Sequence, residues 1–422
     1  MNLYLGIDFG TSGARAVVID AAEDIKAEVQ YRFEEAPGRS KAYLPTTATA
    51  WEKTLFNLIE QLPLEIRGGI KAIAIDGTSS TVLLCDATGK PISEPLMYND
   101  GRGVEVMDQL SVIAPPNHTV LSATSSLAKL LWLSQNAQVK SQNYYFLHQA
   151  DWLAFLLHGQ LGISDYHNAL KLGYDVQNFC YPDWIENLQL PIHLPQVVTP
   201  GTPVADVLPD IANKLGLRED CVVCAGTTDS IAAFLASGAK SPGEAVTSLG
   251  STLVLKLLSH TRVDDARYGI YSHRLGNLWL VGGASNTGGA VLRHFFSDAE
   301  LESLSDRINP EQESQLDYYP LLKPGDRFPL NDPHLPPRLE PRPADQVEFL
   351  HGLLESLARI EARGYQLLQQ LGATSLTCVY TAGGGAKNPA WTMIRGRYLK
   401  VPMQPPIHTA AAYGTALLAM QR

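Results

Sequence analysis

Apolar side chains follow two different spacings along this chain, and each spacing predicts a different kind of element. Short apolar runs between turn residues predict buried strands, and apolar residues three or four positions apart predict amphipathic helices. Residues 3–8 and 14–20 are apolar runs on either side of a polar, glycine-rich turn, and residues 49–62 show helical spacing. The chain is therefore expected to begin with a strand hairpin followed by a helix.

The rest of the first half continues this alternation. Strands are predicted at residues 70–76 and 81–86, and helices at residues 126–135 and 149–157. Residues 191–209 contain five prolines and little periodicity, which is typical of a connector. The connector separates this block from a second one.

The second block repeats the pattern of the first. Its expected elements are strand 221–225, helix 230–236, strands 245–258 and 269–282, helix 346–370, strand 377–382 and helix 409–420. Residues 322–343 are rich in proline and are expected to form a surface excursion. In both blocks a strand leads into a glycine- and hydroxyl-rich turn that carries an aspartate, Asp8 in the first and Asp229 in the second. Two duplicated α/β halves facing each other would bring both turns to the same ligand.

Length and charge narrow the function classes. At 422 residues the chain is too long for one ordinary core, so two or three domains are expected. The net charge of −10 argues against a nucleic-acid surface, which would be basic. Phosphate ligands stay open, because Mg²⁺, backbone N–H groups and helix N-termini hold a phosphate without bulk positive charge.

Targeting signals and cysteines indicate a cellular compartment. The sequence shows no basic leader followed by an apolar run, and no apolar stretch reaches the roughly 18 residues of a membrane span. The five cysteines are irregularly spaced, and Cys221 and Cys224 lie in an apolar run that predicts buried thiols. We therefore expect a cytoplasmic protein with no membrane and no nucleic acid as partner. The sequence leaves the oligomeric state open.

The first turn combines an acid, two hydroxyls and two glycines, namely Asp8, Thr11, Ser12, Gly10 and Gly13. A run of free N–H groups in such a turn can cradle a phosphate. A carboxylate beside a phosphate cradle is useful mainly when a cation or a reacting hydroxyl lies between them. The turn therefore indicates nucleotide chemistry.

Asp8 and Asp229 together match the needs of phosphoryl transfer to an alcohol, which requires a proton acceptor and neutralisation of the phosphate charge. One aspartate would accept the alcohol proton and the other would position Mg²⁺. The alternative is that each aspartate only caps a turn or a helix, as Asp often does. For Asp229 this alternative has weight, because a predicted helix follows it.

Two further glycine segments extend the nucleotide hypothesis. Gly250, Ser251 and Thr252 interrupt an apolar strand, either as a second phosphate clamp or as a bulge or hairpin turn. The run 383–385 follows an apolar strand and precedes Asn388, which suits backbone lying flat against a nucleoside, although a flexible loop is the alternative. P-loop, zinc-protease and serine-hydrolase motifs are all lacking in the sequence.

These motifs, taken in order, resemble those of the FGGY carbohydrate kinase family over nearly the whole chain. The matching segments are residues 6–20, 98–102, 129–133, 165–169, 225–238 with 248–253, and 380–403. In the substrate motif, Tyr98 stands where the family has tryptophan. The chain is most similar to the short xylulokinase-like branch of cyanobacteria and plants, whose members resemble D-ribulose kinases.

The resemblance implies an α/β fold of two ribonuclease-H-like domains, as in actin and hexokinase, with an active-site cleft between them. Residues 1–224, completed by a helix at 405–422, would form the N-terminal sugar-binding domain. Residues 225–404 would form the C-terminal ATP-binding domain. The implied ligands are ATP, Mg²⁺ and a small sugar.

The resemblance also assigns roles to individual residues. Asp229 would be the general base, and Asp8 would bind the sugar or Mg²⁺ through water. The sugar would be bound by Asp8, Thr78, Ser79, Asp100 and Asp229. The nucleotide would be bound by Gly10, Thr11, Ser12, Gly250, Ser251, Thr252, Gly384, Gly385 and Asn388.

Residues 79–80 depart from the family pattern in a way that bears on the substrate. Polyol kinases carry Arg-Glu there and xylulokinases Met-His, whereas this chain has Ser79-Ser80. Small hydroxyls leave a roomier, uncharged pocket, which favours a ketopentose. We therefore expect ATP-dependent phosphorylation of D-ribulose, with D-xylulose as the alternative. A non-catalytic sugar- or nucleotide-binding regulator and an actin-like filament protein are the rival classes.

Overall fold

The computed structural model describes residues 2–33, 47–136 and 143–421, and the chain divides into two compact units. Unit 1 comprises Met1–Ala236 and Ala410–Arg422, and unit 2 comprises Ser237–Thr409. The sequence prediction put the first boundary after residue 224. The structure differs because helix α9 (Asp229–Ala236) packs against the C-terminal helix α14 (Ala411–Met420) of unit 1. Asp229 therefore belongs to the first unit.

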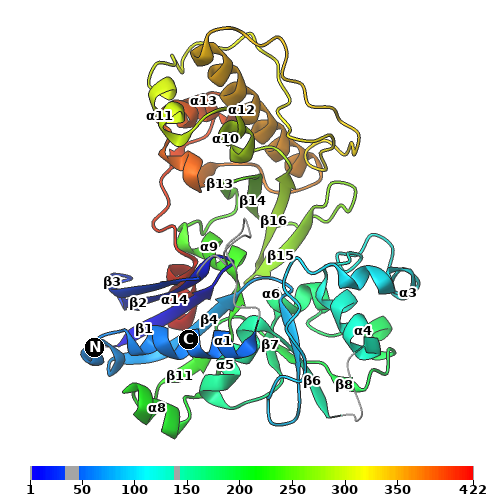
Figure 1. The fold of residues 1–422 in the computed structure, drawn as a ribbon, viewed down its shortest axis with the longest axis vertical. Coiled ribbons are helices and arrows are strands. Elements are labelled where there is room, and N and C mark those ends of the chain that lie inside the picture. Colours follow the sequence, from blue (N-terminus) through cyan, green and yellow to red (C-terminus); the bar gives the residue numbers. More distant parts are fainter. Residues whose placement is uncertain (1, 34–46, 137–142, 422) are drawn as a thin grey trace. The chain divides into compact units, whose positions relative to one another are not determined.

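Unit 1 is built on a sheet that mixes parallel and antiparallel strands (Figure 1). Its strand order is β10 (Pro203–Asp206), β11 (Val222–Cys224), β4 (Ile70–Gly77), β1 (Leu3–Phe9), β2 (Gly13–Asp20) and β3 (Ile25–Arg32), with β12 (Thr227–Thr228) also paired to β4. β1 and β2 form the hairpin that the sequence predicted. β1 runs parallel to β4 and β4 runs parallel to β12, so these three strands end on the same side of the sheet.

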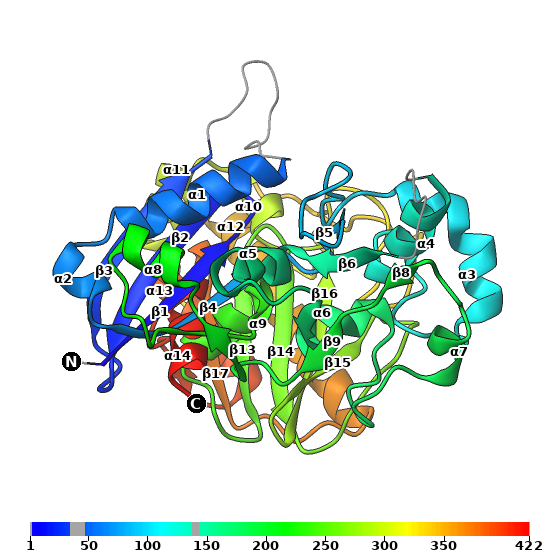
Figure 2. The ribbon, with the colours of Figure 1, turned by 90° about the horizontal axis from the view of Figure 1, so that it is seen from below.

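The two faces of this sheet are covered by different helices (Figure 2). Alternate β1 side chains such as Leu5 and Ile7 belong to the main core, together with Trp51 of α1 (Ala48–Glu60). The opposite face lies under α14, and small residues line it. A Cβ at Gly6 would lie 2.0 Å from the carbonyl oxygen of Ala412, so only glycine allows this approach of helix to strand. Asp8 shares this face, because side chains alternate along a strand.

A smaller lobe of unit 1 carries the predicted substrate motif at residues 98–102. One of its sheets is formed by β5 (Val82–Cys85), β6 (Tyr144–His148) and β8 (Ile192–His193). The other is formed by β7 (Ile163–Asp165) and β9 (Gln196–Val198). Its helices are α3 (Met107–Ile113), α4 (Ser126–Asn136), α5 (Gln149–His158), α6 (Tyr166–Ala169) and α7 (Asp183–Glu186). Leucines of α4 form much of its core.

Unit 2 repeats the arrangement of unit 1. Its sheet has the order β15 (Tyr271–Leu275), β16 (Leu278–Ser285), β14 (Leu253–Ser259), β13 (Glu244–Leu249), β17 (Cys378–Ala382) and β18 (Met403–Gln404). β13 is antiparallel to β14 and parallel to β17, as β1 is antiparallel to β2 and parallel to β4. The helices are α10 (Gly289–Phe295), α11 (Asp298–Ser305), α12 (Gln346–Gln370) and α13 (Pro389–Leu399). The repeat of pattern seen in the sequence is thus a repeat of architecture.

Two predicted strands are hairpins in the structure. The run 245–258 divides into β13 and β14 at the Gly250 turn, and the run 269–282 divides into β15 and β16 at Gly276. Gly276 has φ +59°, a left-handed conformation that glycine adopts without a steric penalty. A hairpin turn was one of the alternatives predicted at residues 250–252, whereas the turn at Gly276 was missed because apolar residues flank it closely on both sides.

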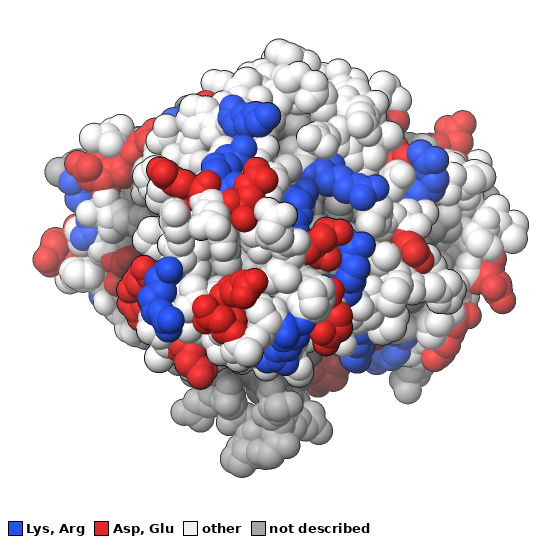
Figure 3. All heavy atoms as spheres, turned by 90° about the horizontal axis from the view of Figure 1, so that it is seen from above, with Lys and Arg blue, Asp and Glu red and all other residues white. Residues whose placement is uncertain are grey.

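The described surface carries both signs of charge. Figure 3 shows basic and acidic side chains interspersed over the face that it draws. None of the helices within residues 2–33, 47–136 and 143–421 is long and apolar enough to span a bilayer.

Candidate active site

Three aspartates meet where three parallel strands of unit 1 end. Asp8 lies opposite Asp76 in the β1–β4 register. Thr228, at the end of β12, lies opposite Gly77 of β4, and Asp229 is the next residue. Side chains at the carboxyl ends of adjacent parallel strands share one edge of the sheet, which is where open α/β sheets bind ligands. The two predicted aspartates are therefore brought together, with a third beside them.

The pKa of Asp8 reflects this crowding. The pKa of Asp8 is raised to about 6: burial raises it most, a hydrogen bond with Asp76 lowers it, and the charge of Asp229 raises it. Like-charged carboxyl groups held close together disfavour simultaneous ionisation. A perturbed carboxyl group of this kind is typical of a functional site.

Asp76 was missed by the sequence analysis. It is completely buried, and its Oδ2 accepts a hydrogen bond from the Thr415 hydroxyl of α14. Burial and the neighbouring Asp8 raise the pKa of Asp76 well above its ordinary value. Oδ1 of Asp8 and Oδ1 of Asp76 accept no hydrogen bond from an N–H or O–H of the described residues. The signal that could have found Asp76 is an acid ending an apolar strand directly opposite Asp8.

Asp229 begins α9, and its Oδ1 accepts a hydrogen bond of 2.6 Å from the Ser230 N–H. The strand before it is held from α6: the hydroxyl of Thr227 lies 2.7 Å from Nδ1 of His167, and the Asn168 amide donates to the Thr227 carbonyl at 3.2 Å. The capping interpretation of Asp229 is thus compatible with a chemical role, because one carboxylate oxygen faces the helix start.

The turn after β4 holds the predicted residues Thr78 and Ser79. The Thr78 hydroxyl is buried and bonded inside the protein, 2.5 Å from the Thr81 hydroxyl and 3.2 Å from Oε1 of Gln149. Ser79 is half-buried, whereas its neighbours Thr78 and Ser80 are buried. Ser79 is therefore the side chain of this turn that is most accessible to a ligand.

Asp100 is held by its own segment. The Arg102 guanidinium donates to both of its carboxylate oxygens, at 3.0 Å from Nε and 2.6 Å from Nη2. Burial raises the pKa of Asp100, and the Arg102 hydrogen bonds and charge outweigh this, so that the pKa lies below its ordinary value. Asp100 is a fixed anion with a partner.

The first turn presents its hydroxyls to the outside. The Gly10 N–H donates to the Gly13 carbonyl at 3.0 Å, which closes the turn, and Thr11 and Ser12 between them are exposed. A Cβ at Gly13 would lie 2.3 Å from the Tyr31 carbonyl oxygen. The predicted phosphate residues of unit 1 are therefore accessible on a turn closed by two glycines.

The two glycine turns of unit 2 lie side by side at the ends of the parallel strands β13 and β17. A Cβ at Gly383 would lie 2.7 Å from the Leu249 carbonyl oxygen and 3.1 Å from the Gly250 nitrogen. The hydroxyl of Ser251 accepts from Arg293 at 3.0 Å, and Ser251 and Thr252 are exposed. The structure thus brings the predicted phosphate clamp at residues 250–252 next to the predicted nucleoside-binding segment at residues 383–385.

Besides its predicted role in nucleotide binding, the Asn388 side chain has a structural role. Its Oδ1 caps α13 by accepting from the Trp391 N–H at 2.9 Å, and its Nδ2 donates to the Ser305 hydroxyl at 2.8 Å. A Cβ at Gly385 would lie 2.5 Å from the Trp391 ring. Asn388 and Gly385 therefore fix the backbone of this turn, with Gly384 in the open.

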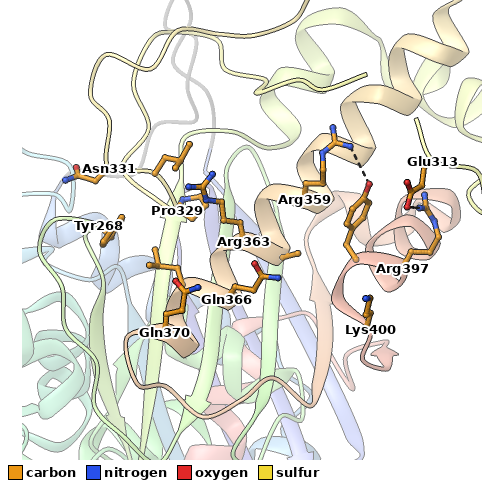
Figure 4. Close-up of a pocket in the computed structure, with 14 residues that line it drawn as sticks. Tyr268, Glu313, Pro329, Asn331, Arg359, Arg363, Gln366, Gln370, Arg397 and Lys400 are labelled. Atoms are coloured by element: carbon orange, nitrogen blue, oxygen red, sulfur yellow. Dashed lines mark hydrogen bonds and ion pairs between the residues drawn. The ribbon is translucent and has the colours of Figure 1, made fainter. Parts of the chain in front are cut away.

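A separate cavity of about 760 Å³ opens along α12 of unit 2 (Figure 4). Its lining includes Arg359, Arg363, Arg397 and Lys400. Arg359 bonds to the Tyr398 hydroxyl at 3.4 Å, and Arg397 is bonded to the buried Glu355. None of the predicted site residues lines this cavity.

Comparison with known proteins agrees with this architecture. Residues 3–236 match the model of the N-terminal domain of the FGGY family of carbohydrate kinases, and residues 245–421 match that of its C-terminal domain. A xylulose kinase of Staphylococcus epidermidis is 22% identical over 441 residues, which cover 99% of this chain and 87% of that protein. A gluconokinase of Bacillus subtilis is 22% identical over 371 residues, covering 79% and 70%.

Solved structures show the same fold. A xyloylose kinase from Brucella ovis superposes with a TM-score of 0.84 at 22% identity, covering 99% of this chain and 90% of that one. Plasmodium falciparum glycerol kinase with ADP gives a TM-score of 0.83 at 17% identity, covering 99% and 89%. The resemblance to the FGGY family and the two-domain fold class that it implied are confirmed. The chain belongs to the FGGY family of carbohydrate kinases, and it is a two-domain α/β phosphotransferase that uses ATP and a sugar.

Proposed function

We propose that this kinase phosphorylates a small ketose, D-ribulose first, to give D-ribulose 5-phosphate. The observation that carries the proposal is the convergence of Asp8 and Asp229 at the strand ends of unit 1, beside a turn whose accessible side chain is Ser79. A ketopentose offers only hydroxyls and a carbonyl, so a pocket of hydroxyls and carboxylates suits it. D-xylulose is the second candidate, because several relatives of this chain are named xylulose kinases.

In the proposed reaction, Asp229 accepts the proton of the terminal sugar hydroxyl as that oxygen attacks the γ-phosphate of ATP. General-base assistance of this kind contributes about 10²–10⁴-fold to the rate. With a pKa of about 6, Asp8 is an anion at neutral pH and accepts hydrogen bonds from the sugar. Asp8 would thus orient the sugar while Asp229 takes the proton.

The nucleotide is proposed to bind through the exposed hydroxyls and backbone of the glycine turns. In unit 1 these are Thr11 and Ser12, with Gly10 closing the turn. In unit 2 they are Gly250, Ser251, Thr252, Gly384, Gly385 and Asn388. Because the Asn388 side chain caps α13, its contribution to nucleotide binding is proposed to be the shape of the turn.

Mg²⁺ fits the donors of this site, and Asp8 is the residue that would hold it. The described residues contain no cluster of three or more acidic, histidine or cysteine side chains able to bind a metal by themselves. Mg²⁺ in phosphoryl transfer commonly takes few protein ligands, with phosphate oxygens and water completing its shell. When bound, it neutralises charge on the phosphates. The buried, unpaired Oδ1 of Asp8 suits contact with such a cation directly or through water.

The test is ADP release, in a coupled assay, against a panel of ketopentoses, aldoses and polyols. We expect turnover to be highest with D-ribulose and to fall at least 100-fold in Asp229→Ala. Asp220→Ala, which removes an exposed aspartate of the same unit, is the matched control and should leave turnover unchanged. A wild type that only hydrolyses ATP across the panel would favour the regulator hypothesis instead.

A further inference from the structure

Lys129 is a buried lysine for which the proposed reaction has no use. It lies on α4 and is completely inaccessible to solvent. Lysine is almost never fully buried unless its ammonium group is paired. Its interactions therefore indicate what it is for.

The Lys129 ammonium group contacts backbone carbonyls. Its Nζ lies 2.7 Å from the Ser80 oxygen, 2.6 Å from the Met97 oxygen and 3.3 Å from the Tyr98 oxygen. An ammonium group has three N–H donors, and a neutral amine has two. Three acceptors around one nitrogen thus match the number of donors of the charged form. Burial lowers the pKa of Lys129 to about 7, and the nearby Asp100 carboxylate opposes this shift.

The two segments that Lys129 joins are those that carry the proposed sugar residues. One is the turn that contains Ser79 and Ser80, closed by a Thr81 N–H to Thr78 carbonyl bond of 3.1 Å. The other is the turn that leads into Asp100, whose N–H donates to the Met97 carbonyl at 2.9 Å. A β-bridge between Val82 and Leu96 aligns the two segments, and Lys129 hydrogen-bonds to backbone carbonyls of both turns.

The Ser80 backbone needs such support. Its φ of +64° is a left-handed conformation, which non-glycine residues disfavour and which persists where the surrounding structure enforces it. Lys129 of α4 donates a hydrogen bond to the Ser80 carbonyl, whereas the serine side chain adds no restraint, since its buried hydroxyl has no partner among the described residues.

A second residue of α4 also contacts the segment that contains Asp100. Trp132, one helical turn after Lys129, lies under the Arg102 guanidinium at 4.8 Å, and its Nε1 donates to Glu105 at 2.9 Å. One face of α4 thus holds both the Tyr98 to Arg102 segment and the Ser80 turn.

We propose that Lys129 is a positioning residue that sets the geometry of the sugar pocket by holding the Ser79–Ser80 turn and the Met97–Asp100 turn in register. The proposal rests on the proposed function, because it takes both turns to contact the sugar. It makes Lys129 a determinant of sugar affinity that acts through backbone and touches no ligand.

The test compares Lys129→Met and Lys129→Gln with the wild type. Methionine removes all three hydrogen bonds and glutamine can donate two. We expect the KM for the sugar to rise at least tenfold in the methionine variant and by less in the glutamine variant. The KM for ATP and the sugar-independent hydrolysis of ATP should stay within twofold. Lys90→Met, which removes an exposed lysine of the same lobe, is the matched control with no expected change.

A structural readout separates this inference from the proposed function. Amide hydrogen exchange in peptides covering residues 77–81 and 97–100 should quicken in the Lys129 variants, whichever sugar the enzyme accepts. Unchanged exchange, or sugar and ATP parameters that worsen in equal proportion, would overturn the positioning role. Should the methionine variant fail to fold, the glutamine variant decides on the same criteria. Quickened exchange in an enzyme that phosphorylates no sugar would overturn the proposed function but would still support the positioning role of Lys129.

Discussion

Replacing Asp8 by asparagine is expected to change how the stability of unit 1 depends on pH. The pKa of Asp8 is about 6 in the folded protein, against an ordinary value of 3.8. This difference corresponds to about 3 kcal/mol, at about 1.4 kcal/mol for each tenfold change in proton affinity. The cost of burying the Asp8 charge is absent below about pH 3, where the group is protonated in both states, and is complete above about pH 7.

The sign follows from proton binding. Between these pH values the folded state binds more protons at Asp8 than the unfolded state does, so the free energy of unfolding of the wild type falls as pH rises. Asparagine cannot ionise and escapes this cost. The stability of Asp8→Asn relative to the wild type should therefore increase by about 1.5 kcal/mol between pH 5 and pH 8, the part of the total that lies in this interval.

Urea unfolding, followed by hydrogen exchange in peptides from β1 and β4, measures unit 1 apart from unit 2. The experiment is done without nucleotide and Mg²⁺, which would add their own charges. Asp20→Asn is the control, because Lys26 lowers the pKa of that half-buried aspartate and its difference from the wild type should be flat between pH 5 and pH 8. A flat difference for Asp8→Asn, or one of opposite sign, would refute the account of the acidic cluster.

Two further predictions test the sugar turn and the core of unit 2. Ser79→His should change the ranking of sugars with the KM for ATP within about twofold, as measured on the same sugar panel, and an equal loss for all sugars would contradict a pocket role for Ser79. Arg395→Met should lower the free energy of unfolding of unit 2 by about 3–5 kcal/mol, because it leaves the buried Glu361 carboxylate without its bidentate partner. In a urea titration followed by exchange of β17 peptides, adding Glu361→Met should recover most of this loss. Failure to recover it would mean that packing, and not the unpaired charge, dominates.

The candidate site was partly visible in the residues. Asp8 and Asp229 stood out because each ends a strand and begins a glycine- and hydroxyl-rich turn, a local pattern that needs no knowledge of distant contacts. Asp76 was not visible, since an acid at the end of an apolar strand carries no local signal of a partner on another strand. Its importance comes from its register opposite Asp8 and its hydrogen bond from Thr415.

Thr78 and Lys129 illustrate the same limit. A threonine in a polar turn predicts a hydroxyl that is available to a ligand, yet the Thr78 hydroxyl is hydrogen-bonded to Thr81 and Gln149. The motif around Lys129 indicated a family signature, but its three carbonyl partners come from segments 31 to 49 residues away. Such partners are chosen by the packing of α4 against the turns.

Local patterns in the chain therefore determined the family, the duplicated α/β plan, and most strands, helices and glycine turns, because periodicity and turn chemistry act over a few residues. Tertiary structure decided which acids share an edge, which hydroxyls are used internally, and to which unit Asp229 belongs. The last of these depends on the contact between α9 and α14, whose residues lie almost at opposite ends of the second block. Strand register and helix packing set these outcomes, and both are long-range properties that become defined when the sheet assembles and buries its two faces.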